Sequence, residues 1–290
     1  MSALRSAASG TRPAPAAYPI SSWIRLLGSE FRLVVTRRRN IAGLATLSAV
    51  PVLIAVAVKI WGAGGGGGPA FISSITENGL FVALAALTVE LPLFLPLAIA
   101  TISGDSIAGE ANIGTLRYLL TVPVGRTRLL TVKYASIVIF SLLATLLVAA
   151  VGLIIGVILF GAGSLPLLSG TEISFAGGLW RLLLACGYLA AGFAAVGAIG
   201  LFISTLTEQP IGAMVATVLI TVGMFIADTI QQLDWLHPYL LTHWWSAFAD
   251  VLRDPMYGGN IGRGLITAAV YAVVFWLAAW ARLTTKDVTS

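Results

Sequence analysis

The two histidines of the chain, His237 and His243, are the first residues to consider for chemistry. Imidazole nitrogens bind divalent metals, and Asp234 or Asp250 could add a carboxylate ligand. A separation of six residues, however, does not stack two side chains on one face of an α-helix, which has about 3.6 residues per turn. We therefore expect this chain to bind neither a metal ion nor any other cofactor.

Ser106 and Cys186 are the candidates for a catalytic nucleophile. Ser106 lies in the segment GDSIAG, but a nucleophile elbow needs glycine where this chain has Ala108. The topology derived below also places both histidines across a membrane from Ser106, so it has no base. Cys186 is the single cysteine and lies in an apolar stretch without a nearby cation. Hydrolase chemistry is therefore not expected.

A run of five glycines, residues 64–68, shares only its composition with a phosphate-binding loop. A Walker-type loop needs lysine and then serine or threonine after its last glycine, whereas Pro69 and Ala70 follow here. We interpret the run as a flexible turn. No other segment carries the Walker pattern, so the chain is not expected to hydrolyse ATP itself, and it is not predicted to be an enzyme.

The elements that must position any functional residue are long apolar helices. Hydrophobic residues make up 58% of the chain and charged residues 10%, and the mean hydropathy is +0.95. Six apolar windows are long enough to cross a membrane, namely 41–61, 79–102, 135–160, 182–206, 211–230 and 265–281. The sequence thus predicts an all-α polytopic membrane protein with six transmembrane helices, an N-terminal interfacial helix and short outer helices before the last span.

The basic residues are distributed unevenly over the segments between these spans. Seven arginines precede the first span, four basic residues lie between the second and third, two follow the last, and four lie in the other connections. Short basic segments resist translocation. We therefore expect both termini and the segment 104–128 in the cytoplasm, with the chain in the plasma membrane of a bacterium. The pI near 9.7 then reflects orientation and not nucleic-acid binding.

Residues 21–39 are predicted to form an amphipathic helix on the inner leaflet. Apolar residues recur there at spacings of three and four: Trp23, Leu26, Leu27, Phe31, Val34 and Val35. Arg37, Arg38 and Arg39 would face anionic headgroups. The alternative is a plain cytosolic extension of the first span. Residues 1–20, rich in Ala, Ser and Pro, are expected to be a disordered tail.

Glu90 lies at the midpoint of the second predicted span and is followed by Pro92 and Pro96. A charge at mid-membrane costs about 2.5 to 3.5 kcal/mol on insertion scales, so it needs compensation. The prolines remove backbone donors and loosen the helix at this point. Two interpretations carry equal weight: Glu90 lines a translocation path or a subunit interface, or it is protonated or bonded to a neighbouring helix.

Small residues form ridges on two spans, at Gly152 and Gly156 on the third and at Gly187, Ala191 and Ala195 on the fourth. Such ridges let helices pack closely, either within one chain or between protomers. The long segment 231–262 is rich in aromatic residues, namely Trp235, Tyr239, Trp244, Trp245, Phe248 and Tyr257. We expect one or two short helices in the outer membrane interface there, a simple aromatic belt being the alternative.

The segment 104–128 is polar and basic although it connects two apolar spans. It contains GEANIGTLRYLLTVPVGRTR, which is preceded by ISGDSIA and continues as LLTVKY into the third span. Its ordered features are Gly109, Glu110, Gly114, Thr115, Leu116, Leu119, Leu120, Pro123, Arg126 and Lys133. This order resembles the signature of type-two ATP-binding-cassette (ABC) exporter permeases, and the resemblance in architecture extends over residues 21–290.

The resemblance implies a permease subunit that moves a hydrophobic or amphipathic substrate, such as a drug, a lipid or an antibiotic peptide, outward. It implies two copies of a separate cytoplasmic ATPase that bind ATP and Mg, and a second permease that is a copy or a paralogue. The residues that would couple to the ATPase are Gly109, Glu110, Gly114, Thr115, Leu116, Arg117, Leu119, Leu120, Pro123 and Arg126, with support from Trp23, Phe31, Arg37, Arg38 and Arg39.

Particular residue types in the segment fit that role. Leu116, Leu119 and Leu120 would share one helical face suited to a groove on a partner. Glu110 could pair with a basic residue of the ATPase or with the three arginines at 37–39. Glu90, Pro92, Gly152 and Gly156 are candidates for a pathway or for helix packing.

Two other functions stay open. A secondary transporter would need inverted repeats and several charges at mid-membrane, whereas the sequence shows no clear repeat and one central carboxylate. A membrane-embedded transferase or hydrolase would need clustered polar residues at one interface, and the stretch 234–254 is the candidate. Its scattered spacing makes this the weaker alternative.

Overall fold

The computed structural model describes residues 20–61, 78–114, 125–167 and 169–285. Its helices are α1 (Ile20–Thr36), α2 (Arg38–Trp61), α3 (Leu80–Glu90), α4 (Phe94–Asn112), α6 (Arg126–Phe160), α7 (Phe175–Leu206), α8 (Pro210–Ala227) and α9 (Gly258–Thr285). Between α6 and α7, strands β1 (Leu165–Pro166) and β2 (Glu172–Ile173) pair antiparallel. Between α8 and α9 lie the 3-10 helices η2 (Gln231–Leu233), η3 (His237–Tyr239) and η4 (Thr242–Leu252).

The described chain is mostly helical, and several of its helices are long and apolar enough to cross a membrane, as predicted. Five helices meet that test singly, namely α2, α6, α7, α8 and α9. The predicted count of six is reached when α3 and α4, which are bent by 59° relative to each other, are taken as one broken span. The predicted disordered tail, except Ile20, and the glycine run 64–68 lie outside the described residues.

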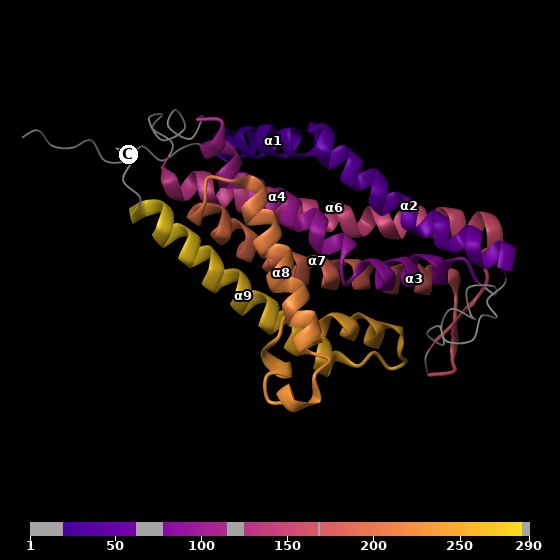
Figure 1. Ribbon diagram of the computed structural model, residues 1–290. Helices are drawn as coiled ribbons and strands as arrows, with labels where there is room; N and C mark the ends of the chain where they lie inside the picture. Colours follow the sequence, from indigo (N-terminus) through magenta and orange to yellow (C-terminus); the bar gives the residue numbers. More distant parts are fainter. Residues whose placement is uncertain (1–19, 62–77, 115–124, 168, 286–290) are drawn as a thin grey trace, which may run out of the picture.

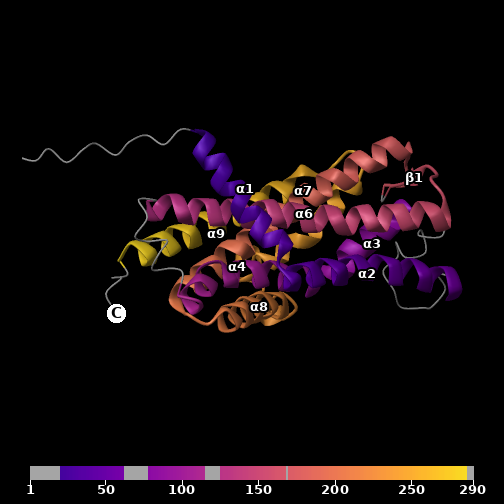
Figure 2. The same ribbon diagram turned by 90° about the horizontal axis from the view of Figure 1, so that it is seen from above.

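Helix α7 forms the centre of the bundle and packs against α4, α6, α8, α9 and η4. Figure 1 shows α3, α6 and α7 running side by side, with α8 and α9 inclined to them. Viewed from above, α1 crosses over α6 (Figure 2). Small side chains allow this dense packing, since Ala185, Ala195 and Ala198 of α7 are fully buried.

The break between α3 and α4 lies where the sequence predicts a loosened helix. Helix α3 ends at Glu90, and α4 begins at Phe94. Pro92 between them has no N–H to donate, so a regular helix cannot continue through this point. Pro96 lies in the first turn of α4, where a missing donor is tolerated.

The glycine ridge on α6 packs within the chain. A Cβ atom added at Gly152 would lie 2.7 Å from Cα of Ala83, and one added at Gly156 would overlap the backbone of Gly79. These glycines therefore let α3 lie directly against α6. On α7, by contrast, a Cβ added at Gly187 would meet no atom within 4 Å, so that part of the predicted ridge makes no close contact.

The predicted outer segment 231–262 holds short helices, as expected, but they are three, all of the 3-10 type: η2, η3 and η4. Its last residues already belong to α9, which begins at Gly258. Its aromatic residues also divide into two groups: Trp245 and Phe248 are buried, whereas Trp235 and Tyr239 are exposed. The buried group packs on α7, with the rings of Trp245 and Phe193 5.2 Å apart.

Candidate coupling site

Six charged side chains from four elements gather where α1, α2, α4 and α6 meet. They are Glu30, Arg37, Arg39, Asp105, Glu110 and Lys133, and we call them the charge cluster. Glu110 is the second residue of the predicted signature, after Gly109, and α4 ends two residues after Glu110. The cluster therefore lies at the entrance to the segment that resembles a coupling loop.

Lys133 on α6 links two other helices. Its Nζ lies 3.3 Å from Oε2 of Glu30 on α1 and 3.5 Å from Oε1 of Glu110 on α4. Only 4% of the Lys133 side chain is exposed, and 15% of each carboxylate side chain. Ion pairs in such a poorly solvated place are screened less than surface pairs, so they fix the relative position of the three helices more firmly.

Asp105 forms the second part of the charge cluster. Its carboxylate pairs with Arg37, in the turn between α1 and α2, and Oδ2 lies 3.2 Å from Nη2 of Arg39 on α2. Gly109 stands one helical turn later, and a Cβ there would lie 2.6 Å from Oδ1 of Asp105. The glycine of the predicted signature thus leaves room for the carboxylate that receives the two arginines.

Gly114 accounts for a second glycine of the signature. Its φ of 73° lies in the left-handed region, which glycine adopts without a steric penalty. Its N–H donates to the carbonyl of Ala111 at 3.1 Å. A glycine in this conformation just after the last helical turn is a common way for an α-helix to end.

The end of α4 is also held by α7. The hydroxyl of Ser204 accepts hydrogen bonds from the backbone N–H groups of Ile107 and Ala108, at 3.0 and 2.8 Å, and donates to the carbonyl of Gly104 at 2.7 Å. A single buried side chain therefore fixes the last two turns of α4. Movement of that end requires α7 to move with it.

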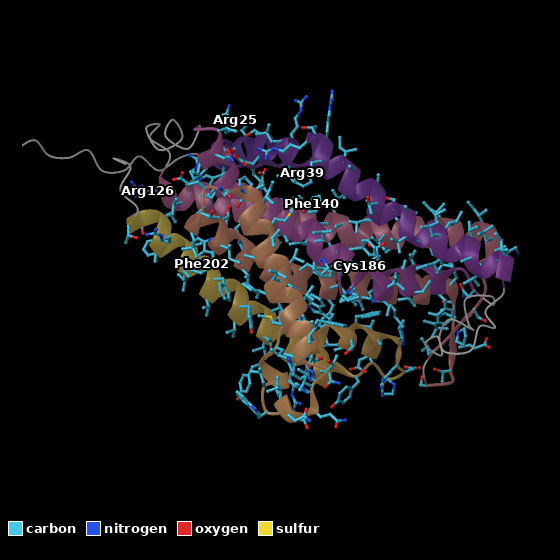
Figure 3. The ribbon with its side chains drawn as sticks, viewed as in Figure 1. Arg25, Arg39, Arg126, Phe140, Cys186 and Phe202 are labelled. Carbon is cyan, nitrogen blue, oxygen red and sulfur yellow. The ribbon has the colours of Figure 1, made fainter. Side chains whose placement is uncertain are left out.

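Arg126, predicted to contact the ATPase, has a role within the chain. It begins α6, and its guanidinium donates to the carbonyls of Leu283 and Thr284 at 3.0 and 2.9 Å. These carbonyls end α9 and would otherwise lack helical partners. The indole of Trp280 donates to Thr127 at 2.8 Å, so the start of α6 and the end of α9 are joined. Figure 3 shows Arg126 at the same end of the molecule as Arg25.

The predicted amphipathic helix is present as α1. It ends at Thr36 and not at Arg39, because the chain turns at Arg37 and the side chain of Asn40 donates to the carbonyl of Val34 at 2.7 Å. From Leu26 onward, all side chains of the predicted apolar stripe are half-buried, namely Leu26, Leu27, Phe31, Val34 and Val35.

Two aromatic and basic residues at this end lie apart from the charge cluster. Trp23 begins the predicted stripe but is exposed, and its ring lies 5.0 Å from the guanidinium carbon of Arg128 on α6. Arg38, the middle member of the arginine triplet, is exposed. Trp23 therefore connects α1 to α6 by a cation–π contact, independently of Lys133.

Several predicted coupling residues lie outside the described residues, and their roles stay predictions. They are Thr115, Leu116, Arg117, Leu119, Leu120 and Pro123. Glu110 was expected to pair with the ATPase or with the arginine triplet. Among the described residues its ion-pair partner is Lys133, whereas Arg37 and Arg39 pair with Asp105.

Glu90 lies apart from the charge cluster, at the opposite end of α4. Its side chain is 0% exposed, and neither carboxylate oxygen has a hydrogen-bond partner among the described residues. The interpretation that Glu90 is bonded to a neighbouring helix is therefore wrong for the described residues. The other interpretations stay predictions: a protonated carboxyl, a residue that lines a translocation path, or a residue of a subunit interface.

The two histidines lie close together although they do not share one helical face. The rings of His237 and His243 are stacked, with centroids 5.8 Å apart. The sequence argument assumed one α-helix, but His237 belongs to η3 and His243 to η4, and Leu240 and Leu241 intervene between them. The turn between the two 3-10 helices brings the rings together.

Sequence reasoning selected neither Asp105 nor Glu30 as a site residue. Glu30 had a signal: it is the one acidic residue in register with Leu27, Phe31 and Val34 on the apolar stripe. A carboxylate at a half-buried position of an amphipathic helix needs a cation opposite it. Asp105 had none, because its partners lie 68 and 66 residues earlier in the chain.

Comparison with known proteins gives one family. A family model described as "Protein of unknown function (DUF2705)" matches residues 52–289. The match includes Glu90, Asp105, Glu110 and Lys133, whereas α1 and the arginine triplet precede it. No curated protein matches the chain. Because the family model covers well over half of its length, the chain belongs to the DUF2705 family.

Proposed function

We propose that the chain is the membrane-spanning permease subunit of an ABC exporter, driven by a separate cytoplasmic ATPase. The observation that carries the proposal is the charge cluster, which joins α1, α2, α4 and α6 at the entrance to the segment 113–125. A segment that transmits a movement from a partner subunit must be attached rigidly to the helices that it moves. The protein would lie in a bacterial plasma membrane with the charge cluster and both termini in the cytoplasm.

The proposed mechanism is mechanical. When two ATPase subunits close on ATP and Mg, they would push on the segment between α4 and α6. The charge cluster would pass that displacement to α1 and α2, and Ser204 would pass it to α7. Helix α6 has 35 residues and is about 50 Å long at about 1.5 Å per residue, so it could carry the motion across the bilayer.

An apolar cavity of about 340 Å³ supports a hydrophobic or amphipathic substrate. It lies between α2, α4, α6 and α8 and is lined by residues that include Leu47, Phe94 and Phe140. Arg39, whose guanidinium pairs with Asp105, also lines this cavity. Apolar walls beside one cation suit a molecule with a hydrocarbon body and an anionic group. The full transporter would contain a second permease, either a copy of this chain or a paralogue.

Purification in mild detergent tests the proposal. The wild-type chain should copurify with a nucleotide-binding subunit, and the complex should hydrolyse ATP. Leu116→Asp should abolish copurification, because a charge would enter an apolar groove. Tyr239→Asp is the matched control, since Tyr239 is exposed and lies in η3, outside the segment between α4 and α6. This variant should still copurify with the partner. Loss of the partner in both variants, or in neither, contradicts the proposal.

A second experiment addresses coupling itself. Glu110→Gln should keep the ATPase subunit bound and insertion normal, yet separate ATP hydrolysis from transport, because the Lys133 pair that holds α4 is weakened. The readout is the ratio of substrate moved to ATP hydrolysed in vesicles, with a lipophilic dye as the probe. An unchanged ratio counts against a coupling role for Glu110.

One observation favours a secondary transporter as a second candidate. Helices α3 and α4 are broken next to the buried Glu90, and broken helices with ionisable residues form binding sites in that class. The purified chain in liposomes would then move substrate with an ion gradient and without ATP. Transport that needs ATP and the second subunit would exclude this candidate.

A further inference from the structure

Asp228, His237 and His243 bring three metal-ligating groups together at the end of α8. One ligand atom from each lies within 4.8 Å of the other two. Asp228 follows α8 directly, His237 lies in η3 and His243 in η4. All three side chains are half-buried, so the group is neither a loose surface cluster nor closed to solvent.

The orientation of His237 is set by the backbone. Its Nε2 lies 3.2 Å from the carbonyl oxygen of Ile230, which can only accept a hydrogen bond. In the neutral ring Nε2 is then the nitrogen that carries the proton, and Nδ1 presents the lone pair. Metal-binding histidines use this arrangement, in which the ring nitrogen opposite the metal donates to a carbonyl.

The lone pair of His237 faces the other ligands. Its Nδ1 lies 4.0 Å from Oδ1 of Asp228 and 3.6 Å from Oδ1 of Asp234. The Nδ1 of His243 lies 2.6 Å from the same Asp228 oxygen. Ligand atoms in a tetrahedral zinc site are about 3.4 Å apart, given bonds of about 2.1 Å. Shifts of under about 1 Å bring these separations to that value, and the exposed side chain of Asp234 is free to move.

We propose that Asp228, His237 and His243 bind a divalent transition-metal ion of zinc's class, with Asp234 or water as the fourth ligand. Two imidazoles and a carboxylate suit zinc and exclude calcium and magnesium, which prefer oxygen ligands alone. The ion would fasten η3 and η4 to the end of α8. The site is independent of the proposed transport function and replaces the expectation that the chain binds no metal.

Isothermal titration of the full-length chain in detergent tests the site. The chain is purified with a tag free of histidine, so that its own two histidines are the only ones present. ZnCl₂ should bind at one ion per chain with micromolar affinity or better, and MgCl₂ should not bind. Loss of a ligand in His237→Ala or Asp228→Asn should weaken zinc binding by more than the roughly 10- to 100-fold typical of outer-shell changes.

Glu172→Gln is the matched control, because Glu172 is an exposed carboxylate of β2 outside the metal group. It should bind zinc like the wild type. Should the ligand variants not fold, the absorption spectrum of Co²⁺ bound to the wild-type chain decides the matter. Intense visible bands of a four- or five-coordinate ion support the site. No zinc binding by the wild type, a six-coordinate aquo spectrum, or equal affinity in His237→Ala would overturn it.

Discussion

Lys133 and Glu90 are both nearly inaccessible ionisable residues of the bundle, but their surroundings differ. Lys133 is 4% exposed and has carboxylates of two other helices within 3.5 Å. Glu90 is 0% exposed, and its oxygens have no hydrogen-bond partner among the described residues. A buried charge with ion-pair partners holds together the helices that carry those partners. A buried carboxyl without partners instead destabilises the fold around it.

This contrast distinguishes the two halves of the broken span by the contacts that hold them. The end of α4 is joined to its neighbours by ion pairs and by Ser204, whereas α3 is held by close packing against the glycines of α6. The bend between them contains Glu90. We infer that α4 belongs to the part that receives force, and that the bend is where the bundle can change shape.

The largest expected effect comes from Lys133→Met. The substitution removes the cation that Glu30 and Glu110 share, and breaking a buried pair costs about 3 to 5 kcal/mol. Unfolding by titration with sodium dodecyl sulfate measures the change in free energy. The triple variant Lys133→Met, Glu30→Gln, Glu110→Gln should recover most of the loss. A single variant as stable as the wild type would show that the cluster does not hold these helices.

Gly156→Ala tests the packed half. The added Cβ would overlap the backbone of Gly79, and backbone atoms cannot rotate away. Overpacking of this kind costs about 1 to 3 kcal/mol. Gly187→Ala is the control, since nothing lies near an added Cβ there, and it should be neutral or slightly stabilising. The same titration compares the two variants, and equal stabilities would contradict the close approach of α3 and α6.

Glu90→Leu should have the opposite sign. It removes a buried carboxyl that has no partner among the described residues, and such a group costs about 1 to 3 kcal/mol. We therefore expect higher thermal stability in detergent together with impaired transport if the bend must move. Lower stability would mean that Glu90 makes an interaction in the assembled protein, as the subunit-interface interpretation requires.

Arg126→Gln should have the smallest effect, a loss of about 1 kcal/mol, because its hydrogen bonds to the end of α9 are partly exposed. Arg282→Gln serves as the control, because Arg282 lies in the last turn of α9 and is exposed, and it should change stability less. Hydrogen exchange of the amides near Thr284 localises the effect. Identical exchange in both variants would remove the proposed role of Arg126 in joining α6 to α9.

Much of the fold could be predicted because hydrophobicity has a local signature. Each predicted apolar window coincides with a helix or with the bent pair, and the break at Pro92 follows from a missing backbone donor. The half-buried stripe of α1 follows from helical periodicity. The ends were less accurate: α6 begins at Arg126, nine residues before the predicted span, because the part of a helix that extends beyond a hydrocarbon core need not be apolar.

The candidate site could be predicted only in part, because its contacts join distant segments. The glycines at 109 and 114 stood in the signature, but the reasons for them, room for Asp105 and a positive φ, needed coordinates. The pairing of Lys133 with Glu30 spans 103 residues. The histidine pair was misjudged because no local rule showed that residues 231–252 would form 3-10 helices instead of an α-helix.

Chemical labelling at position 116 tests the central claim most directly. Leu116→Cys is placed in a Cys186→Ala background, which removes the single native cysteine. The account predicts no reaction with a membrane-impermeant maleimide in intact cells, reaction in inside-out vesicles, and protection there when the ATPase subunit is bound. Reaction from outside intact cells, or full reactivity in the presence of the bound ATPase, would contradict a loop seated in a cytoplasmic motor.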